Sequence, residues 1–279
     1  MAASFSINAR QVQTARGAIS YLESGHGPVL MLLHGIGSSA RSWQAQLQTL
    51  ASQFHVIAWN APGYGASTHL PDDAPSVSEY ATSLRALLDA LNITRMHLLG
   101  HSLGALIAGR FAALHPELVQ SLQLASCAIG HAQYEPARRA TLLQSRLDDV
   151  TQLGIDGMAQ KRGPNLLTNA APPAMRTSVV DTMAGLDPHG YAQAARMLSG
   201  GDLIADIAAL EPRIPLHVLY GAQDTITPPQ VNMEAAAARA GTEVTQIPQA
   251  GHAVYIEQAD LFSRAASLFA ARHTTEIQT

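Results

Sequence analysis

Residues 96–104 read Met-His-Leu-Leu-Gly-His-Ser-Leu-Gly, and this stretch decides the fold. Its beginning is an apolar run typical of a buried strand, and helical spacing of apolar residues begins at Leu103 and continues to Leu114. Between strand and helix, Gly100 and Gly104 leave the room that a strained turn around Ser102 needs. Such a turn lifts the serine hydroxyl clear of the sheet, at the positive end of a helix. The pattern predicts a nucleophilic serine at the end of a buried strand.

Short continuous apolar runs recur on both sides of this turn, each followed by Gly, Ser, Asn or Pro. They occupy residues 29–34, 54–59, 96–99, 118–124 and 216–220. Continuous runs are typical of strands buried on both faces of a parallel sheet. Helical patterns lie between them, at residues 77–91, 103–114, 230–240 and 254–271. Strand and helix alternate, which predicts an α/β fold: a mostly parallel sheet with helices on both faces. Residues 4–9 and 18–23 are expected to add a short antiparallel edge.

The alternation stops between about residues 130 and 207. Runs of strand type give way there to helical spacing interrupted by Pro and Gly, as at residues 137–153 and 190–198. Strand character returns at Leu216. We therefore expect residues 1–129 and 208–279 to form one core and residues 130–207 to form an inserted helical cap.

Composition narrows the class of protein. The 279 residues are 47% hydrophobic and 14% charged, which suits one globular domain with an elaboration. With a net charge of -4, the chain lacks the excess of Lys and Arg that is typical of nucleic-acid-binding proteins. Residues 1–18 lack the apolar run of a signal peptide, and no stretch reaches the roughly 18 apolar residues of a membrane span. A single cysteine, Cys127, fits a reducing compartment. These features predict a cytoplasmic protein with no nucleic-acid or membrane partner, and they leave homo-oligomers open.

A serine hydroxyl needs a base to remove its proton and an acid to orient that base. Asp224 follows the run at residues 216–220, on a loop at the carboxyl end of a strand. His252 follows a further short strand at residues 243–247. We therefore predict Asp224 as the orienting acid and His252 as the base. Asp224 could also be a turn former, and His252, one of twelve histidines, a packed or surface residue.

The tetrahedral intermediate of acyl transfer also needs donors for its oxyanion. His34-Gly35-Ile36-Gly37 ends the run at residues 29–34. We predict that the backbone NH groups of Ile36 and Leu103 supply these donors, although a glycine turn without catalytic role fits the same residues. This chemistry requires no metal and no cofactor.

With Ser102, Asp224, His252 and the His34-Gly35 loop in place, the sequence resembles the alpha/beta-hydrolase superfamily over nearly its whole length. The order serine, aspartate, histidine is the order of that superfamily. Two further stretches resemble it: residues 60–67 (Asn-Ala-Pro-Gly-Tyr-Gly-Ala-Ser), a turn after the second strand, and Ala-Gly-His at 250–252. Relatives that are haloalkane dehalogenases or epoxide hydrolases have aspartate at the nucleophile position, so the serine here favours ester-type chemistry.

Within the expected cap, residues 187–194 (Asp-Pro-His-Gly-Tyr-Ala-Gln-Ala) and 201–203 (Gly-Asp-Leu) are similar to a segment of 3-oxoadipate enol-lactonases. Where those enzymes lead us to expect an Arg-Trp pair, the chain reads Lys-Arg-Gly-Pro at 161–164, so the resemblance does not carry their substrate with it. Meta-cleavage-product hydrolases, which split carbon-carbon bonds, share the triad. Their Gly-Pro-Gly stretch after His-Gly is absent, because Gly37 leads directly into Ser38-Ser39-Ala40.

These observations predict a serine hydrolase that cleaves a small carboxylic ester or lactone through an acyl-enzyme. Three alternatives stay open: a carbon-carbon bond hydrolase of meta-cleavage products, a non-catalytic small-molecule-binding protein, and a cofactor-free lyase or oxygenase. Arg139 and Arg162 are candidate contacts for a substrate carboxylate, although surface arginines usually have no such role. Cys127 lies just past a core strand, where it either borders the pocket or is a small buried residue.

Overall fold

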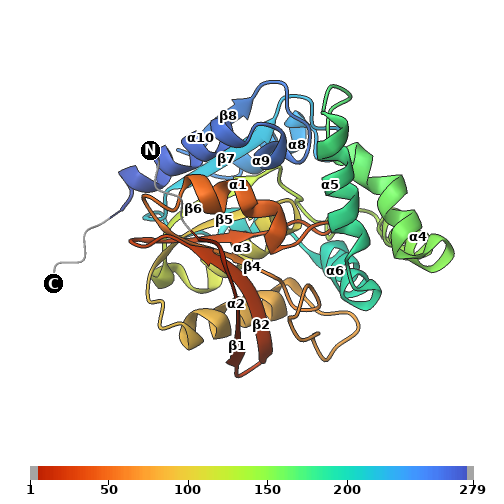
Figure 1. Cartoon of the computed structure of the whole chain (residues 1–279), viewed down its shortest axis with the longest axis horizontal. Helices are drawn as coiled ribbons and strands as arrows, with labels where there is room; N and C mark the ends of the chain where they lie inside the picture. The colour runs from red at the N-terminus through yellow and green to blue at the C-terminus, as the bar shows by residue number, and fades with distance from the viewer. Residues whose placement is uncertain (1–5, 275–279) are drawn as a thin grey trace.

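The computed structural model describes residues 6–274, and these form an eight-stranded sheet with helices on both faces (Figure 1). The strand order is β1-β2-β4-β3-β5-β6-β7-β8. The strands are β1 (Asn8–Thr14), β2 (Gly17–Ser24), β3 (Val29–Leu33), β4 (His55–Trp59), β5 (Met96–His101), β6 (Val119–Ala125), β7 (Leu216–Gly221) and β8 (Glu243–Ile247). From β4 to β8 every neighbouring pair is parallel, whereas β1 and β2 form an antiparallel edge. The predicted α/β class is confirmed.

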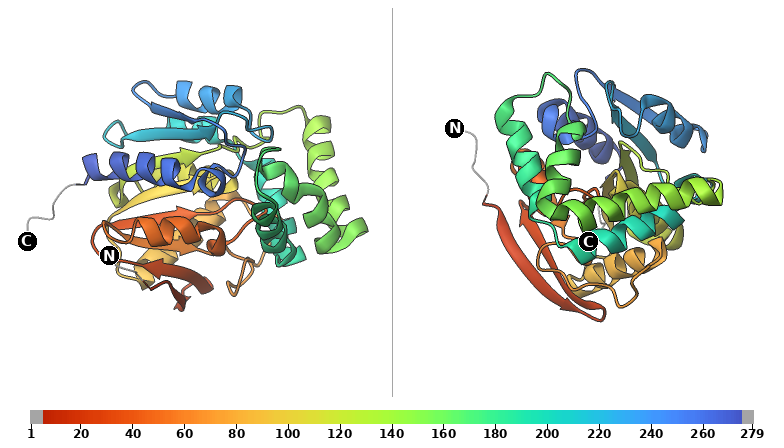
Figure 2. Two further views of the ribbon diagram at one scale, coloured as in Figure 1. Left: turned by 45° about the horizontal axis from the view of Figure 1, so that its top comes forward. Right: turned by 90° about the vertical axis from the view of Figure 1, so that its right-hand side faces the viewer.

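Helices enclose the sheet and also gather beyond one end of it, where α4, α5 and α6 lie together (Figures 1 and 2). The helices are α1 (Gln44–Thr49), α2 (Val77–Ala90), α3 (Leu103–Leu114), α4 (Pro136–Arg162), α5 (Pro173–Ala184), α6 (Pro188–Gly200), α7 (Leu203–Ala208), α8 (Pro229–Ala237), α9 (Val254–Glu257) and α10 (Ala259–Arg272). None of those in residues 6–274 has the length and apolar character needed to cross a membrane.

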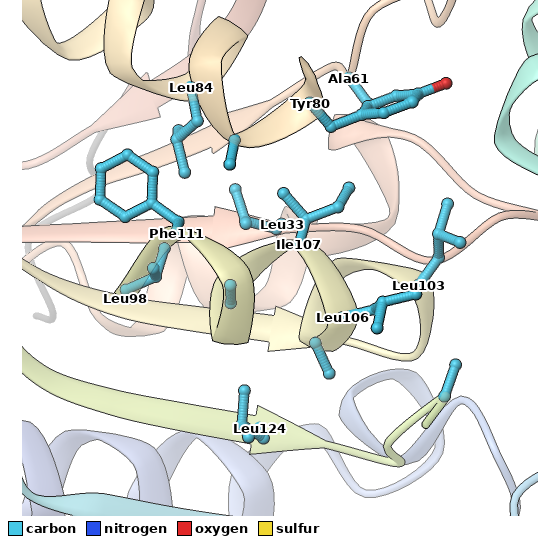
Figure 3. Close-up of a cluster of buried hydrophobic side chains, with 14 of the residues drawn as sticks. Leu33, Ala61, Tyr80, Leu84, Leu98, Leu103, Leu106, Ile107, Phe111 and Leu124 are labelled. Atoms are coloured by element: carbon cyan, nitrogen blue, oxygen red, sulfur yellow. The ribbon is translucent and has the colours of Figure 1, made fainter. Parts of the chain in front are cut away.

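Two apolar cores, one on each face of the sheet, hold the strands in place. Because successive side chains of a strand point to opposite faces, Met31 and Leu33 enter one core and Leu30 and Leu32 the other. All four side chains are fully buried, which is worth about 1.5–3 kcal/mol for each residue. Figure 3 shows part of the first core, where side chains of α3, α2 and β3 meet. The second core packs α1, α9 and α10 against the other face.

Most predicted elements are confirmed within three residues, and the first strand of the amino-terminal edge is one of the exceptions. The first strand was expected at residues 4–9, but β1 is Asn8–Thr14. Ser4 and Phe5 lie outside the described residues. β1 is largely exposed, so it carries no apolar run that the sequence could show. The helix expected at residues 254–271 is two helices, because the backbone at Gln258 (φ −127°) leaves the helical region.

The segment between β6 and β7 holds four helices, α4 to α7. The helix expected at residues 137–153 is longer, since α4 continues to Arg162 through a kink at Gly154 (φ 68°). The pattern at 190–198 is confirmed as part of α6, and α5 was not predicted. α4 packs against α5 and α6, while α7 packs against α3. The division into core and cap stays a prediction.

Candidate active site

Ser102 occupies the strained turn that the sequence predicted. It joins β5 to α3 with φ 54° and ψ −113°, a conformation that costs a non-glycine residue about 1–3 kcal/mol and is found most often at functional sites. Both glycines are needed for it. A Cβ at Gly100 would lie 2.1 Å from the carbonyl oxygen of Gly104, and one at Gly104 would lie 2.2 Å from that of Leu33. The Ser102 amide donates to the Ala125 carbonyl (2.8 Å), which ties the turn to β6.

The structure brings Ser102, Asp224 and His252 to one edge of the sheet, and all three are buried. Ser102 and His252 line one cavity, and Asp224 lies behind the imidazole. His252 Nδ1 donates to Asp224 Oδ2 over 2.9 Å. Within residues 6–274 the Ser102 hydroxyl makes no hydrogen bond within 3.5 Å, so it is unpaired at the cavity wall. In ligand-free structures such bonds are often long and tighten when substrate binds.

Thr227 completes the surroundings of Asp224, and sequence reasoning missed it. The amides of Ile226 and Thr227 donate to Asp224 Oδ1 (2.9 Å each), and the Thr227 hydroxyl donates to Oδ2 (2.9 Å). Burial alone would raise the pKa of Asp224. The charge and hydrogen bond of His252 and the two groups of Thr227 outweigh it and lower the pKa to about 2. Asp224 is therefore a fixed carboxylate at neutral pH.

The loop after β3 is rigidly held, with Ile36 facing the cavity. His34 Nδ1 donates to the Gly35 carbonyl (2.9 Å), and its Nε2 accepts from the Ala61 amide (3.1 Å). The His34 bond holds the peptide that carries the Ile36 amide, and the Tyr64 hydroxyl donates to the Ile36 carbonyl (2.9 Å), so the turn at residues 60–67 holds the next peptide. Leu103, the other predicted donor, lines the same cavity. The geometry brings both predicted donor positions to the cavity that Ser102 lines.

Two more residues brace the loop that carries His252. His101 Nε2 donates to the His252 carbonyl over 2.8 Å, and burial lowers the pKa of His101 to about 3, so it is neutral. Glu257 accepts from the Gly251 amide (2.7 Å) and from the Thr168 amide (2.9 Å). His101 directly precedes Ser102 in the sequence, so its position near the site could have been predicted, whereas no sequence pattern pointed to Glu257.

The buried histidines make the stability of the fold sensitive to acid. Burial lowers the pKa to about 3 for His101 and about 4 for His34, His97 and His217. Between about pH 6.5 and 4 the unfolded chain thus binds protons that the native chain does not, so the free energy of unfolding falls as the pH falls. Each histidine contributes at most about 1.4 kcal/mol per pH unit.

We therefore expect urea unfolding at pH 7, 6 and 5 to show a steep loss of stability, with the native state lost between about pH 4 and 6. His97→Gln, which lies away from the cavity, should reduce the slope by about one proton. A free energy of unfolding that stays constant from pH 7 to 5 would contradict these pKa values.

The cavity in front of Ser102 measures about 530 Å³ and is walled in part by the inserted helices. Val179 and Met183 of α5 and Tyr191 and Leu198 of α6 line it. Cys127 does not; it is fully buried, and burial raises its pKa to about 12. Within residues 6–274 no cluster of three or more His, Cys, Asp or Glu side chains has a metal-binding arrangement.

Of the two arginines singled out from the sequence, Arg139 does not line the cavity and Arg162 does. Arg162 Nε donates to Asp149 Oδ2 (2.6 Å), and Lys161 Nζ donates to Oδ1 of the same carboxylate (2.6 Å). The charge of Arg162 is therefore already compensated within the protein.

Comparison with known proteins agrees with this geometry. The family described as alpha/beta hydrolase fold matches residues 28–259. A pimeloyl-[acyl-carrier protein] methyl ester esterase of Chromobacterium violaceum is 32% identical over 246 residues, which cover 86% of this chain and 93% of the esterase. An (E)-2-((N-methylformamido)methylene)succinate hydrolase of Acinetobacter baylyi is 28% identical over 236 residues, covering 80% of this chain and 83% of that enzyme.

Solved structures match the fold over nearly the whole chain. A thermophilic esterase from Thermogutta terrifontis superimposes with a TM-score of 0.87 at 23% identity, covering 96% of this chain and all of the esterase. An enol-lactonase from Burkholderia xenovorans gives 0.82 at 23% identity, covering 94% of this chain and all of that chain. Because the family match spans most of the sequence and includes the Ser102 turn, Asp224 and His252, the chain belongs to the alpha/beta-hydrolase family.

Proposed function

We propose that the chain is a serine hydrolase that cleaves a small carboxylic ester or lactone through an acyl-enzyme. One observation carries the proposal: an unpaired serine hydroxyl on a strained turn lines the same cavity as an imidazole that a buried carboxylate holds. A positive φ at a non-glycine residue of this kind is found most often at functional sites.

The hydrogen bonds assign a role to each atom. His252 Nδ1 carries its proton toward Asp224, so Nε2 is left as the basic nitrogen. Ser102 Oγ attacks the substrate carbonyl carbon as its proton passes to Nε2. The amides of Ile36 and Leu103 donate to the oxyanion that forms. Collapse of this intermediate expels the alkoxide, which takes the proton from Nε2 and leaves the acyl group on Ser102.

Water completes the cycle. His252 removes a proton from a water molecule, which attacks the acyl carbonyl, and Ser102 leaves with that proton as the acid is released. In a lactone the alkoxide and the acyl group belong to one molecule, so a single hydroxy acid is released. None of these steps calls for a metal or a cofactor.

The inserted helices support a cap function for residues 130–207. Arg146 of α4, Met183 of α5 and Tyr191 of α6 line the cavity together with Ser102 and His252. A cap in this position excludes water from the acylation step and shapes the pocket for the acyl or alcohol group. Figure 2 shows these helices in front of the rest of the chain when the molecule is viewed toward that end.

The relatives favour carbonyl hydrolysis over the other reactions of the fold. One is an esterase of a methyl ester and one hydrolyses a succinate derivative, and a structural neighbour is an enol-lactonase. Their substrates differ from one another, so they support the type of reaction and leave the substrate open.

A substrate panel tests the proposal. The purified chain is expected to hydrolyse 4-nitrophenyl esters of short acids or small lactones. Hydrolysis of a meta-cleavage product without any ester or lactone turnover would replace this function by carbon-carbon bond hydrolysis. Ligand binding without turnover of any of these compounds would indicate a non-catalytic binding protein.

A further inference from the structure

The charges on the cavity wall are of one sign. Arg41, Arg146 and Arg162 line the cavity, and within the described residues no Asp or Glu does. Arg162 is compensated by Asp149, and Arg41 is exposed to solvent. Arg146 differs from both, because it is half-buried and belongs to the middle of α4, over the cavity.

Arg146 has no partner of opposite charge in the part of the chain that the structure describes. Its one hydrogen bond there runs from Nη1 to the Tyr191 hydroxyl, at a long 3.4 Å. Among residues 6–274 no carboxylate oxygen lies within 4.0 Å of its guanidinium group. The other cavity-facing arginine that is half-buried, Arg162, forms an ion pair. A partly desolvated cation without a counter-charge costs free energy, and such groups are normally retained where they bind something.

The surroundings of Arg146 show what would fit. Tyr191 is buried beside it and offers a hydroxyl next to the guanidinium. Nearby walls are apolar, with Met183 and Leu198 among them. The guanidinium charge also reaches Tyr64, where it opposes the rise in pKa that burial causes.

We propose that Arg146 binds a carboxylate of the substrate, so that the enzyme acts on half-esters or lactones that carry a free acid group. This inference rests on the proposed function and names its substrate class. A guanidinium group presents two parallel NH donors that match the two oxygens of a carboxylate, and Tyr191 can donate a third hydrogen bond. The apolar walls then contact the hydrocarbon part between the acid and the ester carbonyl.

Two matched pairs of substrates test the proposal, because the acid can lie on either side of the ester bond. Mono-4-nitrophenyl adipate is compared with 4-nitrophenyl hexanoate, and 4-butyryloxybenzoate with phenyl butyrate. The variants are Arg146→Gln, Arg146→Lys and Arg139→Gln. Arg139 is the control: it lies on the same helix, seven residues and about 10 Å toward the amino terminus, and does not line the cavity.

We expect the wild type to prefer the acidic member of at least one pair, by about 10- to 100-fold in kcat/KM. Arg146→Gln should abolish that preference and leave the neutral ester within about threefold, whereas Arg139→Gln should keep it. Arg146→Lys keeps the positive charge but lacks the two parallel NH donors of the guanidinium group, so its preference for the acidic substrate is expected to be intermediate. An acid-to-neutral ratio that is the same in wild type and Arg146→Gln overturns the proposal, while ester hydrolysis by Ser102 would still stand.

Calorimetric titration with adipate separates this inference from the proposed function, because it needs no turnover. Adipate should bind the wild type and Arg139→Gln and bind Arg146→Gln at least tenfold more weakly. Equal binding to all three proteins, or binding to none of them, overturns the carboxylate site whether or not any ester is hydrolysed.

Discussion

Ser102→Ala is expected to reduce kcat for the best ester by about 10⁶-fold while the protein stays folded. The loss is large because the substitution removes the attacking oxygen itself, and the remaining rate comes from the oxyanion donors and substrate binding. The hydroxyl makes no hydrogen bond within the described residues, so its removal breaks no hydrogen bond among them. Stopped assays of ester turnover, with circular dichroism for the fold, provide the measurement.

Ser126→Ala is the matched control. Ser126 follows β6, the strand beside Ser102, and is also a buried serine with a positive φ (44°) and no hydrogen-bond partner for its hydroxyl among residues 6–274. It does not line the cavity. Its substitution should leave kcat within about twofold, because Ser126 resembles Ser102 in burial and backbone conformation but does not face the substrate cavity. Equal losses in both variants would show that the effect comes from the fold.

Asp224→Asn is expected to lower kcat by about 10⁴-fold. The amides of Ile226 and Thr227 donate to Oδ1, so an asparagine keeps its oxygen there and turns its NH2 toward His252. His252 Nδ1 must then accept a hydrogen bond, which places the ring proton on Nε2. An imidazole in that tautomer cannot remove the proton of Ser102. KM is expected to change little, because Asp224 does not line the cavity.

Asp206→Asn is the control for removing a buried carboxylate. Asp206 on α7 is as buried as Asp224, and it pairs with Arg110 rather than with a cavity residue. We expect it to affect thermal stability and leave kcat unchanged. A loss of kcat in Asp224→Asn that is no larger than in Asp206→Asn would rule out the orienting role of Asp224.

The parts of the site that were predictable are those with local sequence patterns. Ser102 stands between an apolar run and a helical pattern, and two glycines mark the turn, so one continuous stretch, residues 96–114, contains the whole signal. Asp224 and His252 each follow a parallel strand, β7 and β8, and the carboxyl ends of parallel strands lie at one edge of the sheet. The sheet itself was predictable because its central strands are buried on both faces and read as continuous apolar runs.

The parts that were missed depend on contacts between distant segments or on exposed elements. β1 is an exposed edge with almost no apolar signal. Thr227 is different, because it had a local signal: an aspartate side chain commonly accepts hydrogen bonds from the backbone amides two and three residues later in a turn. Arg146 had none: the sequence pointed to Arg139, which precedes it by two helical turns. Whether Arg139 or Arg146 faces the cavity is decided by the packing of α4 on α5 and α6.

The acyl-enzyme on Ser102 is the central claim, and trapping it is the most direct test. The wild type is mixed with 4-nitrophenyl butyrate, quenched in acid during turnover and digested for peptide mass analysis. We predict one butyryl group on the peptide that contains Ser102, and no adduct in Ser102→Ala. Turnover with the butyryl group on another residue, or undiminished turnover by Ser102→Ala, would contradict the account.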